Sequence, residues 1–260
     1  MILDEIAART IQRINEQKLL LPIELLSEKA FSLPKNNEFP FEAAIKRAGI
    51  SFICEVKKAS PSKGIIAENF DYMQTAIDYE NAGADCISVL TEPYWFKGSD
   101  DYLKAISEEV SIPTLKKDFT CDSYMIFQAK LLGAKAVLLI CSMLTAKQIS
   151  EFLQLCDDLG LSALVEAHDK DEVKTAVSCG ARLIGVNNRN LKTFEVDIDN
   201  CIRLREYVGN NVLFIAESGI KTPQDIERLC QYGIDGVLIG ETLMRSENKK
   251  AALNALRGTV

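Results

Sequence analysis

Several short apolar runs in this 260-residue chain end in polar and charged side chains. In the first run, Glu55 and Lys57 stand two residues apart, so they share one face of an extended segment. The groups that end the later runs are Lys116, Lys117, Asp118, Glu166, Asn187, Asn188, Arg189, Glu217, Ser218 and Glu241. Any one of these side chains, taken alone, could equally be an ordinary solvated residue at the end of a strand. Ammonium and carboxylate groups are common general acids and bases, so the set predicts acid–base chemistry if the fold brings these ends together.

A basic loop and two glycine turns predict an anionic ligand. Lys57, Lys58 and Lys63 crowd one short segment, although the whole chain carries a net charge of −7. The alternative interpretation of this segment is a flexible surface loop. Gly219 and Gly240 follow two later runs, and glycine leaves backbone N–H groups open to an anion. We therefore expect a phosphate between the turns Ser218-Gly219 and Gly240-Glu241, with basic help from the loop.

A repeat organises the elements that must position these residues. A glycine followed by an apolar run of strand length recurs, and four further runs match without the glycine signature. Continuous apolar runs are typical of parallel strands buried on both faces. The expected strands lie within 51–56, 82–90, 112–116, 132–140, 161–165, 179–187, 212–216 and 232–240. Helical patterns occupy the intervals 71–82, 122–132, 145–158, 170–179, 222–231 and 242–256.

Eight alternating units predict an α/β fold, namely a closed (β/α)₈ TIM barrel whose site lies at the carboxyl ends of the strands. A doubly wound open sheet is the alternative, although it more often has fewer strands and a glycine-rich first turn. Residues 1–48 precede the repeat and predict an added helical extension, with helices at 2–18, 22–30 and 41–48. No linker is apparent, so we expect a single domain over 1–260.

The composition argues against metal and nucleotide cofactors. The eight cysteines are scattered, with no Cys-x-x-Cys pair, and read as small core residues of a reducing compartment. His168 is the one histidine, which disfavours a histidine-based metal site and makes a structural role the simpler interpretation. Neither a Walker loop nor G-x-G-x-x-G is present. We expect catalysis without a metal or other cofactor.

Charge and hydropathy limit the partners. The acidic balance disfavours nucleic acid or a membrane surface, because both attract basic proteins. No apolar run approaches the length of a membrane span, and the acidic start does not resemble a signal peptide. These features predict a cytoplasmic protein with a small-molecule partner. For the oligomeric state we expect a monomer or a weak homodimer.

The segment Glu55-Val56-Lys57-Lys58-Ala59-Ser60-Pro61-Ser62-Lys63-Gly64 resembles the signature of the indole-3-glycerol phosphate synthase family. The resemblance continues through 87–92, 96–99, 115–119, 164–166, 185–191, 216–220 and 238–240. It implies a carbon–carbon lyase of tryptophan biosynthesis that acts on an anionic phosphosugar, 1-(2-carboxyphenylamino)-1-deoxyribulose 5-phosphate. Ring closure, decarboxylation and dehydration would give indole-3-glycerol phosphate, carbon dioxide and water.

The resemblance also implies roles for individual residues. Lys117 would be the general acid of ring closure, helped by a pKa lowered by neighbouring cations. Glu166 would be the base of the dehydration, and Glu55 with Lys57 a second acid–base pair. The remaining catalytic residues would be Asn187 and Ser218. Substrate-binding residues would be Ser60, Pro61, Phe96, Phe119, Leu139, Arg189, Glu217, Gly219, Leu238, Gly240 and Glu241, with Phe96, Phe119 and Leu139 around the aromatic ring.

Two other functions compete with this interpretation. A Schiff-base aldolase on the same fold needs a lysine nucleophile, and Lys117 is the candidate. A non-catalytic phosphosugar-binding barrel is a second rival, but binding alone does not need both Lys117 and Glu166. Glu241 beside a phosphate would repel it, so we expect its side chain to turn away.

Overall fold

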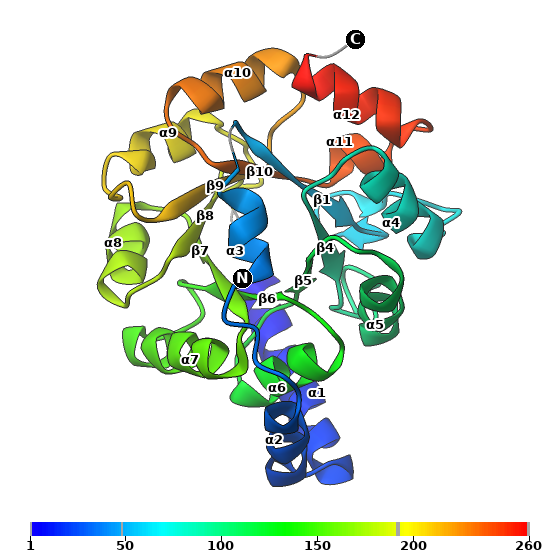
Figure 1. Ribbon diagram of the computed structural model, residues 1–260, viewed down its shortest axis with the longest axis vertical. Helices are drawn as coiled ribbons and strands as arrows, with labels where there is room; N and C mark the ends of the chain where they lie inside the picture. Colours follow the sequence, from blue (N-terminus) through cyan, green and yellow to red (C-terminus); the bar gives the residue numbers. More distant parts are fainter. Residues whose placement is uncertain (1, 48, 191–192, 259–260) are drawn as a thin grey trace.

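The computed structural model describes residues 2–47, 49–190 and 193–258. Within them, eight parallel strands close into a barrel in the order β1-β10-β9-β8-β7-β6-β5-β4 (Figure 1). The barrel strands are β1 (Ser51–Val56), β4 (Cys86–Leu90), β5 (Thr114–Lys117), β6 (Ala136–Ile140), β7 (Ser162–Ala167), β8 (Leu183–Asn187), β9 (Leu213–Glu217) and β10 (Gly236–Ile239). The closed barrel confirms the predicted fold and excludes the open sheet.

Helices surround the barrel and connect its strands (Figure 1). They are α4 (Tyr72–Asn81), α5 (Asp100–Glu109), α6 (Ser123–Leu131), α7 (Ala146–Leu159), α8 (Lys170–Ser178), α9 (Asp199–Arg205), α10 (Pro223–Gln231), α11 (Glu241–Met244) and α12 (Lys249–Arg257). Side-chain caps fix where several begin. Thr145 and Thr222, for example, form capping boxes with Gln148 and Asp225, which satisfy N–H groups that the first turn leaves free.

The outer helices differ from the sequence prediction in three places. The segment 242–256, expected as one helix, is divided into α11 and α12, and the Asn248 side chain caps the second by accepting a hydrogen bond from the Ala251 N–H. Helices α5 and α9 lie in two intervals between the expected strands for which no helix bounds were predicted. A short hairpin of β2 (Ala59–Ser60) and β3 (Gly64–Ile65), also unpredicted, orders the lysine-rich loop after β1.

The strands separate two apolar cores. Side chains that point outward pack against the helices, whereas the inward set, which includes Ile53, Leu115, Leu138 and Leu164, fills the barrel. Alternate residues of a strand face opposite sides, so each strand supplies both cores. This double burial explains why the strands read as continuous apolar runs.

The N-terminal segment forms α1 (Ile2–Leu20), α2 (Ile23–Ser32) and α3 (Pro40–Ile45). Helix α3 covers the amino end of the barrel, where Phe41 and Ile45 join the inner core (Figure 1). The expected helix at 41–48 therefore ends earlier, and Ala48 lies outside the described residues, as does Met1. With one end closed by α3, the carboxyl end of the barrel remains for a site.

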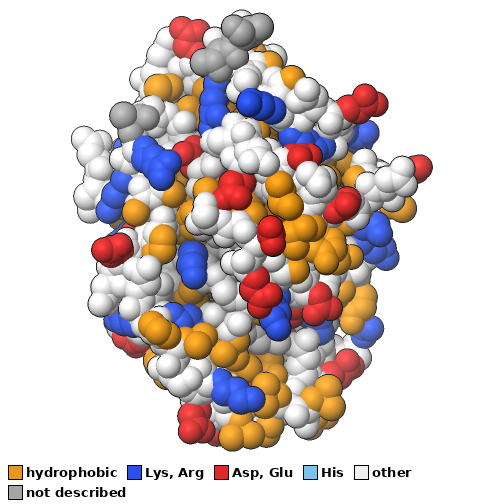
Figure 2. Space-filling view, turned by 45° about the vertical axis from the view of Figure 1, so that its right-hand side comes forward, with side chains coloured by type: hydrophobic (Ala, Val, Ile, Leu, Met, Phe, Trp, Pro, Cys, Tyr) orange, Lys and Arg blue, Asp and Glu red, His pale blue; other side chains and the backbone are white. Residues whose placement is uncertain are grey.

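Helices α1 and α2 pack outside the barrel against α6. Tyr124 donates a hydrogen bond to the Leu21 carbonyl at 3.1 Å, and Gln128 donates one to Gln17 at 3.1 Å. The far ends of both helices carry exposed apolar side chains, including Leu19 and Leu20, and hydrophobic atoms gather at the lower end of Figure 2. The extension is thus fixed to the barrel along one side. Among the described helices, none is long and apolar enough to cross a membrane.

Candidate active site

A cavity of about 690 Å³ occupies the carboxyl end of the barrel. Its walls come from strand ends on every side, and this convergence follows from the parallel barrel, in which all carboxyl ends meet at one rim. Of the site residues predicted from the sequence, those that line the cavity are Glu55, Lys57, Ser60, Pro61, Phe96, Lys117, Phe119, Glu166, Asn187, Arg189, Glu217, Ser218, Gly219, Leu238, Gly240 and Glu241.

Leu139 is the exception and corrects the prediction. It is fully buried in the outer core between the barrel and the helices, whereas its neighbours Leu138 and Ile140 line the cavity. Strand alternation places residues 138 and 140 on the inner face and 139 on the outer face. The predicted apolar wall on β6 is therefore shifted by one residue.

The centre of the site is a lysine between two carboxylates. Lys117 Nζ lies 3.5 Å from Glu166 Oε2 and 3.5 Å from Glu217 Oε2. Burial acts to lower the pKa of Lys117, but the carboxylates of Glu217, Glu166 and Glu55 outweigh it and raise that pKa above the ordinary value. The sequence predicted a lowered pKa from neighbouring cations. That prediction was wrong because the groups facing Lys117 are carboxyl groups and not cations.

The pKa values of the two carboxylates are shifted in opposite directions. Burial and the nearby charge of Glu166 raise the pKa of Glu217 above its usual value. Burial acts in the same direction on Glu166, but Lys117 and His168 outweigh it and lower the pKa of Glu166. Lys117 thus contacts one carboxylate that binds a proton more readily than usual and one that binds it less readily, an arrangement that suits acid–base chemistry.

His168 supports Glu166 from the outer side. Its Nε2 lies 3.3 Å from Glu166 Oε1, and its Nδ1 lies 3.1 Å from Glu172 Oε2. Burial opposes the charged ring, yet the two carboxylates raise the pKa of His168 to about 10. Asn187 adds a hydrogen bond from Nδ2 to Glu166 Oε1 at 3.3 Å. Glu166 is therefore held by groups on two strands besides its contact with Lys117.

A second lysine–carboxylate pair lies on β1 and the residue after it. Lys57 donates a short hydrogen bond to Glu55, and both side chains are largely buried. A Cβ atom at position 240 would collide with the Glu55 carboxylate and approach Lys57 Nζ to 2.9 Å. Gly240 therefore has a role that its sequence context did not reveal, which is to leave room for this pair.

The turns after β9 and β10 form the wall opposite β5. Ser218 and Gly219 have φ of 67° and 88°, both in the left-handed region, which is costly for a serine. Asn188 holds this turn by donating from Nδ2 to the Ser218 carbonyl at 3.2 Å. A strained non-glycine residue kept in place by a buried partner is common at functional sites.

Glu241 does not present a lone negative charge to the cavity. Its Oε1 lies 3.2 Å from Arg245 Nε and 3.8 Å from Lys63 Nζ, and Lys63 comes from the loop after β1. The expectation was that this side chain turns away from the phosphate; Glu241 lines the cavity, with its carboxylate paired to these two cations. Its two cationic neighbours also line the cavity, so this corner is cationic overall.

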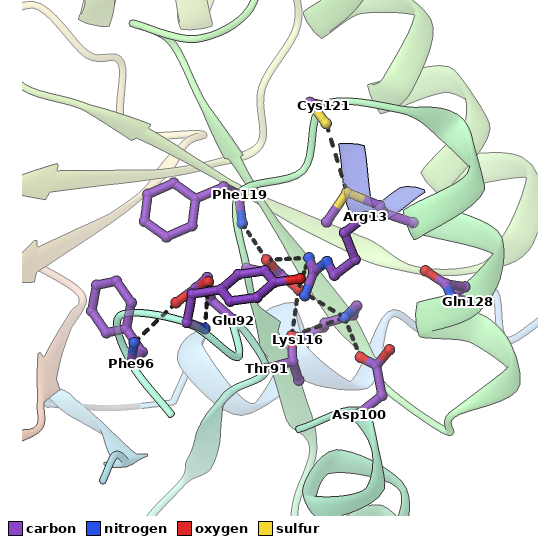
Figure 3. A network of polar contacts seen from close by, with 12 residues as sticks. Arg13, Thr91, Glu92, Phe96, Asp100, Lys116, Phe119, Cys121 and Gln128 are labelled. Carbon is purple, nitrogen blue, oxygen red and sulfur yellow. Dashed lines mark hydrogen bonds and ion pairs between the residues drawn. The ribbon is translucent and has the colours of Figure 1, made fainter. Parts of the chain in front are cut away.

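The aromatic wall is formed by Phe96 and Phe119, whose ring centroids lie 5.8 Å apart. Glu92, almost fully buried, fixes the loop that carries Phe96 by accepting hydrogen bonds from the N–H groups of Tyr94, Trp95 and Phe96 (Figure 3). The remaining apolar lining includes side chains that the sequence did not suggest, namely Ile2, Leu3 and Ile6 of α1 together with Leu90, Phe194 and Val196. No local pattern marks these residues, because they reach the cavity only through the tertiary fold.

The described residues contain no group of three or more His, Cys, Asp or Glu side chains placed to hold a metal ion. The arrangement instead offers ammonium and carboxylate groups beside an apolar wall. Arg189 continues the polar rim, with its N–H donating to Asn187 Oδ1 at 3.0 Å. Leu191, which ends one of the segments that resemble the known family, lies outside the described residues.

Comparison with known proteins places this site in a family. Residues 3–256 match the family model described as Indole-3-glycerol phosphate synthase. A curated protein of that name from Ruminiclostridium cellulolyticum is 55% identical over 259 residues, covering 100% of both chains. One from Lachnoclostridium phytofermentans is 51% identical over 268 residues, covering 99% of each.

Solved structures show the same architecture at much lower identity. A crystal structure of 3-hexulose-6-phosphate synthase superposes with a TM-score of 0.65 at 14% identity, covering 81% of this chain and 100% of that one. That similarity concerns the fold alone. The family match and the high identity over full length carry the assignment, and the chain belongs to the indole-3-glycerol phosphate synthase family.

Proposed function

We propose that this chain converts 1-(2-carboxyphenylamino)-1-deoxyribulose 5-phosphate to indole-3-glycerol phosphate, carbon dioxide and water in the cavity at the barrel mouth. The observation that carries the mechanism is Lys117 Nζ, held 3.5 Å from both Glu166 and Glu217. The lysine ammonium group supplies an acid for ring closure, and the ionised Glu166 supplies a base for dehydration.

Ring closure needs an acid. The aromatic carbon that bears the carboxylate attacks the substrate ketone, and the ketone oxygen gains negative charge. Lys117 carries a proton, because its pKa is raised, and its ammonium group stabilises that oxygen and protonates it. The same raised pKa disfavours the aldolase alternative, since a Schiff base forms only from a neutral amine.

Decarboxylation and dehydration follow. Carbon dioxide leaves with its bonding electrons returned to the ring, and the new hydroxyl must then depart as water. Glu166, ionised by its neighbours, removes a proton as the double bond forms. Lys57 with Glu55 is the second acid–base pair and assists the departing hydroxyl.

The substrate phosphate binds at the turns after β9 and β10. Helix α11 begins at Glu241 without a side-chain cap, so its first N–H groups remain free for an anion. Helix α10 is different, because Asp225 Oδ2 accepts hydrogen bonds from the Lys221 and Thr222 N–H groups at 2.9 and 2.8 Å. Of the two helix starts suggested by the sequence, the one at α11 is therefore the better anion site.

The other end of the substrate fits the opposite wall. Phe96, Phe119 and Leu138 surround the aromatic ring, with Pro61 and Leu238 nearby on the same cavity lining. Polar groups that hold the carboxylate and hydroxyls are Ser60, Asn187, Arg189, Glu217 and Ser218. Binding the ring and the phosphate at opposite ends positions the reacting carbons near Lys117.

The protein is proposed to act in the cytoplasm as a monomer or weak homodimer that binds no nucleic acid. Its activity is tested by adding the substrate to the purified protein and following the fluorescence of indole-3-glycerol phosphate. Multiple turnover supports the proposal. Binding of substrate without any product would instead identify a phosphosugar-binding barrel.

A further inference from the structure

Helix α1 reaches the barrel beside the proposed catalytic lysine. Arg13, in the middle of α1, donates hydrogen bonds from Nη2 to both carboxylate oxygens of Asp118 at 2.9 Å (Figure 3). Asp118 immediately follows Lys117, and its side chain is inaccessible to solvent. The N-terminal extension thus makes a buried ionic contact one residue away from the centre of the site.

Both chain neighbours of Lys117 are held in one buried charge cluster, which consists of Arg13, Asp100, Lys116 and Asp118. Lys116 Nζ lies 2.5 Å from Asp100 Oδ1 and 3.2 Å from Asp118 Oδ2. Lys117 and Asp118 both line the cavity, whereas Lys116, on the opposite face of β5, does not. Ion pairs therefore hold the backbone at Lys117 on both sides along the chain, at positions 116 and 118.

Further hydrogen bonds hold the backbone at the end of β5 in place. Asp118 Oδ1 accepts from the Phe119 N–H at 2.9 Å, and Asp118 Oδ2 accepts from the Thr91 hydroxyl at 2.8 Å. The Lys117 carbonyl accepts from the Thr91 N–H at 3.1 Å. The side chain of Asp118 thus connects Arg13 to the backbone that carries both Lys117 and the aromatic wall residue Phe119.

Arg13 also completes the charge balance of the cluster, which holds two cations and two carboxylates. Burial acts to raise the pKa of Asp118, but Lys116 and Arg13 outweigh it and lower that pKa to about 2. Without Arg13, Lys116 alone would have to neutralise both Asp118 and Asp100. A buried carboxylate left short of partners rearranges toward other donors or water.

We propose that Arg13 is a positioning residue for the reaction: through Asp118 it holds Lys117 where its ammonium group can protonate the substrate. This inference rests on the proposed role of Lys117 as the general acid. Displacing a reacting group by about 1 Å can cost on the order of 100-fold in rate. Arg13, which is not itself part of the cavity lining, is thus able to govern kcat.

A simpler role for Arg13 would be to anchor α1, and the two roles have different kinetic signatures. Ile2, Leu3 and Ile6 of the same helix line the cavity. Loss of anchoring would disturb this apolar lining and raise KM. Displacement of Lys117 would lower kcat and leave KM nearly unchanged.

Lys18 offers a matched control on the same helix. It pairs with Asp122 at 2.6 Å, so it also ties α1 to the segment after β5, but Asp122 caps α6 and does not adjoin Lys117. The experiment measures kcat and KM for Arg13→Met and Lys18→Met, with thermal unfolding of each. We expect kcat to fall by roughly 10- to 100-fold in Arg13→Met alone. An equal loss in both variants, or a loss confined to KM, would overturn the proposal.

Arg13→Lys keeps the charge and provides a second variant should Arg13→Met fold poorly. Its shorter ammonium group cannot hold both carboxylate oxygens in the same way, so kcat should fall several-fold with KM unchanged. Wild-type kcat in Arg13→Lys and Arg13→Met would contradict the proposal. If Arg13→Met does not fold, wild-type kcat in Arg13→Lys alone is sufficient to contradict it.

A double-mutant cycle tests whether Arg13 acts through Asp118. The losses in kcat from Arg13→Met and Asp118→Asn should not multiply in the double variant, because both remove the same contact. Multiplying losses would show that Arg13 acts by another route. Lys117→Ala, assayed in parallel, separates the two levels of inference: if it remains active, the proposed general acid is wrong, whereas if it is inactive and Arg13→Met is normal, only the positioning role fails.

Discussion

The carboxylate of Glu217 occupies the space that a side chain at position 185 would fill. Gly185, on the neighbouring strand β8, has no Cβ, and one built there would overlap Glu217 Oε1. This glycine lets a buried carboxylate lie against the barrel wall and still reach Lys117 at 3.5 Å. The central group of the site thus depends on the absence of a side chain as well as on the residues that are present.

Gly185→Ala should consequently lower kcat, because the added methyl group displaces Glu217 from Lys117. We expect a loss of roughly 10- to 100-fold, measured by steady-state product fluorescence. Gly209→Ala is the control, since its Cβ would meet only the flexible end of Asn211. A Gly185→Ala variant with unaltered kcat would show that the position of Glu217 is unimportant.

The His168 contacts predict a pH-dependent contribution to stability. Folded His168 holds its proton up to about pH 10, whereas the unfolded ring has a pKa near 6.5. Between these values unfolding releases the proton, so the stabilisation is complete below pH 6.5 and declines as pH rises toward 10. Chemical denaturation of the wild type and of His168→Gln across this range should give a stability difference that shrinks with rising pH. A constant difference would refute a charged His168.

The cationic corner at Glu241 predicts how phosphate binding responds to charge. Glu241→Gln removes a negative charge from the cavity lining and frees Lys63 and Arg245. Inorganic phosphate should therefore bind about 2- to 5-fold more tightly, as expected for a partly exposed ion pair, and the gain should shrink with added salt. Calorimetric titration measures it, with Glu247→Gln as the control. Unchanged or weaker binding would place the phosphate elsewhere.

Much of this fold was predictable, because strands buried on both faces produce continuous apolar runs, four of which follow a glycine. Helix α5 was missed because it is rich in charge and buries only Leu103 and Ile106. Helix α9 begins at Asp199, and Ile198 before it provides no side-chain cap, so the sequence carries no start signal. A cap alone was not sufficient, since Ser99 caps α5, and local patterns identify helices most readily where a broad apolar face is buried.

The site was predictable to the extent that topology alone determines it. Charged residues at the carboxyl ends of parallel strands must meet at one rim, whatever the details of packing. The run 136–140 is entirely apolar, so no alternation shows that Leu138 rather than Leu139 faces inward. Arg13 and Asp118 are 105 residues apart, and the direction of the Lys117 pKa depends on neighbours from other strands. Such relationships require the three-dimensional structure.

Glu166→Gln tests the base. The amide retains the size of the side chain but cannot accept a proton, so kcat should fall by about 10²- to 10⁴-fold, far more than KM rises. Glu172→Gln is the comparison, because Glu172 contacts His168 and does not line the cavity. The fall in kcat caused by Glu172→Gln should be much smaller. Equal losses would mean that the charge network, and not the base itself, limits the rate.

The most direct test of the central claim is the rate of indole-3-glycerol phosphate formation by Lys117→Ala, followed by product fluorescence at saturating substrate. The account predicts a fall in kcat of about 10²- to 10⁴-fold, the usual cost of removing one general acid. Circular dichroism should meanwhile show an intact barrel. A variant that turns over at near the wild-type rate would contradict the assignment of Lys117 as the acid of ring closure.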